Sequence, residues 1–271
     1  MSPHTRIGRI SLSTVLLLAV SAAGCTPQTR QMDEMSELDR HLATCEGRDL
    51  VGLSVMPIQP EVFCEHMILG FAEGFAEIGR NQSSSQFCVE SGFLVEEYRE
   101  EFLETVRKNG VVSETDKLLL TADVQPGNRD GKDCNWVGPE KLKNLGRDCR
   151  WGEALVANDR YSVIYDMLIE TGSYSLMAAR RKAAEDLSHC LGYLAGFVGS
   201  GVLAGPVDRD LAYCVDDFHR SDKDPGPRDL TSERLAVIAT EISKLASAQP
   251  EQTFDPAGQY VFDAVAKEFP C

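Results

Sequence analysis

The stretch HCLGYLAGFV, residues 189–198, contains a cysteine, two glycines and no charged side chain. It lies within a longer segment, Leu187–Val207, that has no Asp, Glu, Lys or Arg. Such an apolar segment is compatible with a membrane-spanning helix, a cofactor-binding loop or a buried helix in a water-soluble core. Other parts of the chain favour the buried helix.

A second part of the chain matches this one at a constant offset. Residues 64–88 and 190–214 each begin and end with cysteine, and each has Gly-Phe six and seven positions after the first cysteine. In both, an aromatic residue precedes the second cysteine, and Val and an acid follow it. The offset of 126 residues indicates a duplicated helical unit, with chance similarity as the alternative.

The residue pattern of the duplicated units predicts water-soluble helices that pack closely. The first copy carries Glu65, Glu73 and Glu77 where the second is uncharged, which is typical of an amphipathic helix. Both copies have glycines four residues apart, and this spacing predicts a close helix contact in a soluble core, whereas in a membrane it would indicate dimerisation. These glycines are Gly70, Gly74, Gly192 and Gly196. The further glycines up to Pro206 predict that the second helix ends near Val198.

Most of the remaining chain has helical periodicity, which predicts an all-α, disulfide-stapled bundle. Thr231 is suited to cap the helix that carries Leu235 and Leu245. The other helices are expected over residues 34–44, 60–78, 93–108, 178–198 and 256–268.

The first residues are typical of an exported lipoprotein. Two arginines precede an apolar run, Ile10–Ala23, and small residues lead to Cys25. This order indicates a secretion signal over residues 1–24. The Ala-Gly-Cys ending resembles a bacterial lipobox and predicts lipid attachment at Cys25, with ordinary cleavage after Ala23 as the alternative. Thr26, where Asp would favour the inner membrane, suggests a periplasmic protein on the outer membrane, held there by the lipid alone.

The charge of the chain is strongly negative. The full sequence has 27 basic and 42 acidic residues, for a net charge of −15. Removing residues 1–24 takes away two arginines and no acid, which leaves 25 and 42 and a net charge of −17. Such a field argues against binding to nucleic acid or to anionic lipid surfaces and favours a cationic partner, although solubility alone would also explain it.

Eight cysteines remain once Cys25 is set aside, and an even number in an exported chain predicts disulfides. Duplication should preserve equivalent disulfides in the two copies. A local disulfide is expected to join the short repeated sequences around Trp136 and Trp151. The last pair of cysteines follows by elimination. The two tryptophans are expected to pack around the local bridge, with a functional aromatic clamp as the alternative. The predicted bridges are Cys64–Cys88, Cys190–Cys214, Cys134–Cys149 and Cys45–Cys271.

The sequence contains no convincing catalytic or metal-binding motif. His66 and His189 lie near cysteines but lack the paired spacing of a zinc site. The glycines at 196–201 lack the Gly-Lys-Ser/Thr ending of a phosphate loop. Residues 128–133 resemble a calcium loop without its first and last ligands, which leaves weak calcium binding open. We therefore expect a binding protein without a cofactor rather than an enzyme.

Residues 186–271 resemble the Rap/Tai family of type VI secretion immunity proteins. The resemblance rests on a Cys-x-Gly-Tyr-x-x-Gly start, an aromatic–cysteine pair and a Pro-Cys end, here Cys190, Gly192, Tyr193, Gly196, Tyr213-Cys214 and Pro270-Cys271. It covers about a third of the chain, and the proline that usually follows the family's third cysteine is absent after Cys214. Family members are exported, all-helical and disulfide-bonded; several neutralise peptidoglycan amidases, and some are homodimers.

The resemblance implies an immunity protein in which residues 25–133 form a drifted first helical unit and residues 134–271 the second. The expected partner is a secreted amidase, and homodimerisation stays open. Two loops beside Tyr213-Cys214, at Gly199–Pro206 and Ser221–Arg228, are the expected contact surface. The alternative is an accessory or structural envelope lipoprotein that uses the same fold for docking.

Overall fold

A computed structural model shows how these segments pack. It describes residues 36–44, 58–81, 88–89, 124–125, 140–156, 168–169, 172, 175–204, 213–217, 224–248 and 255–271. Several sequence predictions lie outside this part: the signal at 1–24, Cys25, Cys45, Cys134, Trp136, the side chain of Cys88, the helix at 93–108 and the loop at 128–133.

Helices dominate the described residues, which confirms the all-α prediction. They are α2 (Glu37–Thr44), α3 (Pro60–Asn81), α6 (Leu142–Asp148), η1 (Cys149–Trp151), α7 (Gly152–Val156), α9 (Leu176–Ala204), α10 (Ser232–Ala248) and α11 (Gly258–Glu268). Within the described part, the sheet is limited to one antiparallel pair, β1 (Cys88–Val89) and β2 (Val124–Gln125). None of the described helices combines the length and apolar character needed to cross a bilayer.

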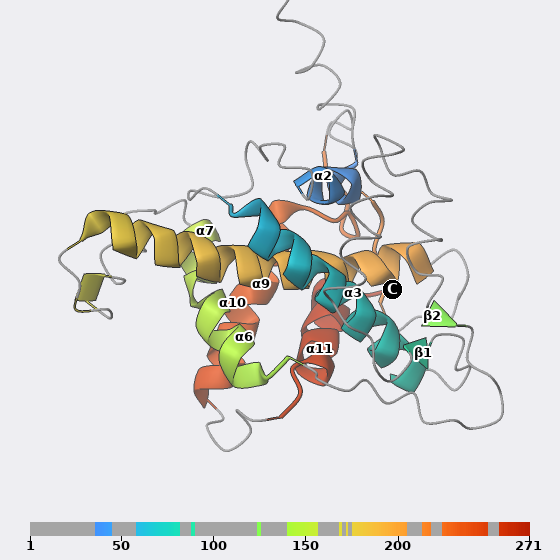
Figure 1. The fold of residues 1–271 in the computed structure, drawn as a ribbon. Helices are drawn as coiled ribbons and strands as arrows, with labels where there is room; N and C mark the ends of the chain where they lie inside the picture. Colours follow the sequence, from blue (N-terminus) through green and yellow to red (C-terminus); the bar gives the residue numbers. More distant parts are fainter. Residues whose placement is uncertain are drawn as a thin grey trace, which may run out of the picture.

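The longest helix, α9, crosses the whole molecule and organises the others (Figure 1). In this view α3 lies along α9, α2 lies above the pair, and α6, α10 and α11 lie below it. The start of α10 is as expected, since Thr231 accepts a hydrogen bond from the backbone N–H of Arg234 at 3.3 Å. Side chains from α2, α3, α6, α9, α10 and α11 share one apolar core, so the two predicted units are packed together.

The predicted glycine contacts hold α3 against α9. A Cβ on Gly192 or Gly196 would lie closer than 3.0 Å to the backbone carbonyl of Phe63 or Met67. A Cβ on Gly70 would clash in the same way with the carbonyl of Tyr193. The two helices therefore approach at backbone distance, which confirms the close packing predicted from the spacing.

The contacts between α3 and α9 are symmetric under the 126-residue offset. Gly70 faces the Tyr193 carbonyl and the Phe197 N–H, whereas Gly196 faces the Met67 carbonyl and the Phe71 N–H. Adding 126 to Met67 and Phe71 gives Tyr193 and Phe197, so each copy makes the contacts of the other. The two helices are thus related by a local pseudo-two-fold axis at their crossing.

The second helix does not end near Val198 as predicted but continues to Ala204. Each glycine costs a helix about 1 kcal/mol in isolation. Here side chains from elsewhere in the chain fill the space beside the glycines: Gly199 lies against Phe71 and Leu38, and Gly201 lies against Tyr213. Tertiary packing offsets the poor helix propensity, so Gly199–Ala204 is helix rather than loop.

The predicted disulfide scheme is wrong for three of its four pairs, one from the duplication, the local pair and the pair obtained by elimination. The observed bridges are Cys149–Cys190 and Cys214–Cys271, with Cα–Cα distances of 5.1 and 4.9 Å. They exclude Cys190–Cys214, Cys134–Cys149 and Cys45–Cys271. Helix α9 rises about 21 Å from Cys190 to Ala204, at about 1.5 Å per residue, and so carries the chain away from Cys190. Cys64 is disulfide-bonded, but the proposed Cys64–Cys88 pair lies outside the described side chains.

Candidate functional site

The surface predicted to contact a partner is located around the Cys214–Cys271 bridge. We call residues 213–217, 224–230 and 269–271 the Cys214–Cys271 corner. The bridge joins Cys271 to Cys214. Beside it, the Cys214 N–H donates to the Phe269 carbonyl at 3.0 Å. Arg228 donates from its guanidinium to the Cys271 carbonyl at 2.7 Å. The corner thus joins two neighbouring segments, 213–217 and 224–230, to the distant residues 269–271.

The loop in this corner is exposed but firmly held. Asp224, Pro225, Pro227 and Arg228 are exposed. The Asp216 N–H donates to the Arg228 carbonyl, and the Leu230 N–H donates to the Asp216 carbonyl, both at 2.8 Å. The Gly226 N–H donates to the Asp229 carboxylate at 2.5 Å. These bonds fix the loop backbone at the surface.

Buried side chains support the corner from below. Tyr213 is fully buried, and its ring meets that of Phe262 edge to face at 5.4 Å. Asp217 accepts a hydrogen bond from the Leu38 N–H at 3.0 Å and so ties the corner to α2. In the other predicted contact loop, Gly199–Gly201 is buried helix, and Gly205 and Pro206 lie outside the described residues.

A cluster of charged side chains lies elsewhere, where α3, α6 and α9 meet. His189 Nδ1 lies 2.5 Å from the Asp148 carboxylate, and His189 Nε2 lies 3.6 Å from the Glu140 carboxylate. The imidazole of His66 packs on that of His189, with ring centroids 3.7 Å apart. Asp148 and His189 directly adjoin the Cys149–Cys190 bridge in sequence. The ion pair and the disulfide therefore join the same two elements.

The charges in this cluster shift the pKa values of its histidines in opposite directions. Burial would lower the pKa of His189, but Asp148 and Glu140 outweigh it and raise the pKa to about 9. Burial and the neighbouring His189 lower the pKa of His66. The raised pKa favours the protonated imidazole at neutral pH, which is the form that pairs with both carboxylates. The Asp148–His189 pair is better explained as a structural ion pair.

The same region contains a second buried polar pair. The Tyr193 hydroxyl donates to Glu73, and Glu73 also accepts the Glu140 N–H at 2.5 Å. Burial, and then the charge of Glu73, raise the pKa of Tyr193 well above 10. Tyr193 and Glu73 both lie inside the bundle. Through Glu73, Tyr193 therefore links α9 to α3 and to Glu140, which precedes α6.

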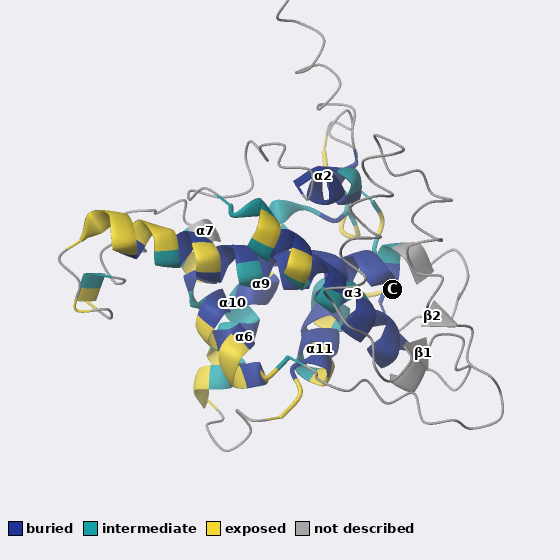
Figure 2. Ribbon diagram, viewed as in Figure 1, coloured by how far each residue is buried: buried dark blue, intermediate teal, exposed yellow. Residues whose placement is uncertain are grey.

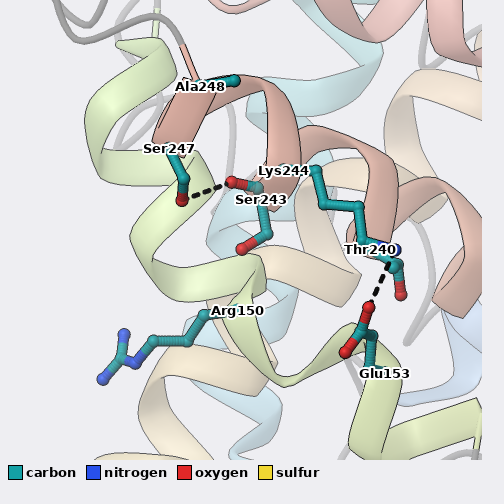
Figure 3. Close-up of a pocket in the computed structure, with 7 residues that line it drawn as sticks. All are labelled: Arg150, Glu153, Thr240, Ser243, Lys244, Ser247 and Ala248. Carbon is teal, nitrogen blue, oxygen red and sulfur yellow. Dashed lines mark hydrogen bonds and ion pairs between the residues drawn. The ribbon is translucent and has the colours of Figure 1, made fainter.

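A shallow polar hollow of about 440 Å³ lies between η1, α7 and α10 (Figure 3). In it Lys244 pairs with Glu153 at 2.8 Å, and the Ser247 hydroxyl donates to the Ser243 carbonyl. Arg150 reaches from the rim to Asp186, with 3.0 Å between its Nη2 and the carboxylate. Lys244, Glu153, Arg150 and Ser247 thus each have a partner, and sequence reasoning did not single out this hollow.

The residues of the family motif are mostly structural. Gly192 and Gly196 contact α3, Cys190 is bridged to Cys149, and Cys214 is bridged to Cys271. Trp151 packs with Ala179, Ala183 and Leu187, whereas Trp136, its expected partner around the predicted bridge or in the alternative aromatic clamp, lies outside the described residues. Within the described ranges, no three His, Cys, Asp or Glu residues are arranged to hold a metal ion. No protein-family model, curated protein or solved structure matches the chain significantly.

Proposed function

We propose that the protein binds a secreted peptidoglycan amidase and inhibits it through the Cys214–Cys271 corner. The observation that supports this most directly is the loop at 224–228, in which four residues are exposed and which is yet held by backbone hydrogen bonds beside a disulfide. A loop that is already ordered loses little conformational entropy when it binds. Protein inhibitors of enzymes need such a rigid, exposed segment and no catalytic residues of their own.

Charge supports the same proposal. The mature net charge of −17 would accelerate encounter with a basic amidase, and added salt would reduce that acceleration. Asp216 and Asp224 are exposed acids of the corner itself. They are therefore the residues through which this attraction would act at close range.

The proposal is tested with the purified protein and an amidase encoded beside it. We expect a stable complex on a sizing column and loss of peptidoglycan hydrolysis at equimolar protein. The double variant Asp216→Lys/Asp224→Lys should associate more slowly, and its rate should depend less on salt. Glu153→Lys, an acid-to-base change in the hollow remote from the corner, serves as the control and should behave like the wild type. Full hydrolysis in the presence of excess protein, without a complex, would contradict the proposal.

A further inference from the structure

Exposed apolar side chains gather at the amino-terminal end of α9 and just before it. Among the described residues, four large hydrophobic side chains are exposed, and three of them lie at this end: Ile169 at 64%, Leu176 at 45% and Met177 at 74%. Figure 2 shows this end of α9 projecting from the buried bundle as an exposed segment. Water-exposed apolar groups gathered in one place are typical of an interaction surface.

Two arginines lie on the same face of α9, one turn further along. Arg180 follows Leu176 by four residues and Arg181 follows Met177 by four, so each pair is stacked along the helix. Both arginines are exposed, and within the described residues neither guanidinium has an ion pair. Lys182 differs, because it pairs with Asp186 at 2.9 Å. A local basic site thus stands out on a chain whose net charge is −15.

The base of this projection is well packed, so its outer side chains are not needed for the fold. Ala179, Ala183 and Leu187 pack with Trp151 on the inner face of α9, and Leu168 joins them. The turn before the helix is closed by a hydrogen bond from the Gly172 N–H to the Ile169 carbonyl at 3.2 Å. This arrangement presents Leu176 and Met177 outward on a supported helix.

We propose that this end of α9 is a contact surface for an anionic lipid bilayer. The apolar side chains come first, and the arginines follow four residues later, about 6 Å further along the helix axis. That order matches the bilayer surface, where the acyl chains lie beneath the charged headgroups. Leu176 and Met177 would enter the acyl boundary while Arg180 and Arg181 meet headgroup phosphates.

The charge distribution favours contact with an anionic bilayer at this end of α9 and disfavours such contact elsewhere on the protein. The arginines attract an anionic surface, whereas the many acids elsewhere on the chain are repelled by it. The protein would therefore bind end-on, with the bundle held away from the bilayer. This contact does not depend on the proposed inhibition of an amidase, because α9 presents it at a site separate from the Cys214–Cys271 corner.

The test compares binding of the purified protein to vesicles of phosphatidylglycerol with phosphatidylcholine and to vesicles of phosphatidylcholine alone. The ratio of the two partition coefficients is the readout, because any lipid on Cys25 contributes to both. We expect a ratio well above one for the wild type. Arg180→Gln/Arg181→Gln should reduce it roughly tenfold, since each basic residue near an anionic surface contributes measurably to binding.

Two further variants make the result specific. Leu176→Ser/Met177→Ser should weaken binding to both kinds of vesicle, because it removes the apolar contact. Lys141→Gln/Lys143→Gln removes two exposed basic groups on and beside α6 and should leave the ratio unchanged. Equal ratios for the wild type and the arginine variant, or an equal loss in the lysine control, would overturn the proposal. Such a result would point instead to a protein partner for this end of α9.

Discussion

Gly196 of α9 lies against the main-chain carbonyl of Met67 in α3, with no space between them for a methyl group. Gly70 has the equivalent relation to Tyr193, 126 residues further along. The close packing of α3 on α9 therefore depends on two glycines, Gly70 and Gly196, which are related by the pseudo-two-fold axis. The helix pair cannot widen at one glycine without disturbing the contact at the other.

Alanine at either glycine should destabilise the protein. Because the added Cβ would meet backbone atoms, which cannot rotate away, Gly196→Ala and Gly70→Ala should each lower the free energy of unfolding by at least about 1–3 kcal/mol. Gly226→Ala is the control, since its Cβ would meet nothing closer than 3.5 Å. Urea unfolding of the three variants measures the effect. Wild-type stability in both helix variants would show that the close contact is absent.

Protonation of His189 should make stability depend on pH. Its pKa is raised from 6.5 when unfolded to about 9 when folded, so its contribution is fully present below pH 6.5 and is lost as the pH rises through 9. The shift corresponds to about 3 kcal/mol. We expect the free energy of unfolding to fall by that order between pH 6.5 and 9.5. In His189→Gln this fall should disappear, and a variant that kept it would assign the titration to another group.

The two described disulfides predict a definite peptide map. Under non-reducing conditions, digestion should yield one fragment that links Cys149 to Cys190 and another that links Cys214 to Cys271. Any fragment that joins Cys190 to Cys214 would contradict this connectivity. The map requires alkylation before digestion, so that free thiols cannot exchange.

Removing the Cys149–Cys190 bridge should be costly. The bridge spans 41 residues, and closing a loop of that length stabilises a protein by about 4 kcal/mol in the chain-entropy model. The double variant Cys149→Ser/Cys190→Ser should therefore unfold at a much lower urea concentration. The ion pair between Asp148 and His189 joins the same elements and is intact at pH 6.5. The loss in free energy of unfolding should therefore be larger at pH 9.5 than at pH 6.5.

Lipid attachment is tested by metabolic labelling with a radioactive fatty acid. The wild type should incorporate the label, and Cys25→Ser should not. Labelling of the variant to the wild-type level would remove the lipoprotein prediction and favour ordinary cleavage after Ala23.

The sequence by itself determined the features that depend on near neighbours. Helical periodicity located α3, α10 and α11 to within a few residues, and Thr231 marked the start of α10. The glycine spacing in both copies predicted that another helix packs closely on each of them, and the structure shows that α3 and α9 are each other's partner. These features are visible in a sequence because residues three or four apart share one face of a helix.

Only the tertiary structure decided how far α9 extends and which cysteines pair. The glycines at 199 and 201 argued against a helix, but Phe71, Leu38 and Tyr213 fill the space beside them. The extended α9 then separated Cys190 from Cys214 and left Cys190 opposite Cys149. The ion pair of His189 with Asp148 arises from the same approach of η1 and α6 to α9. Such pairings depend on the summed lengths and crossings of several helices, and no local pattern of residues records them.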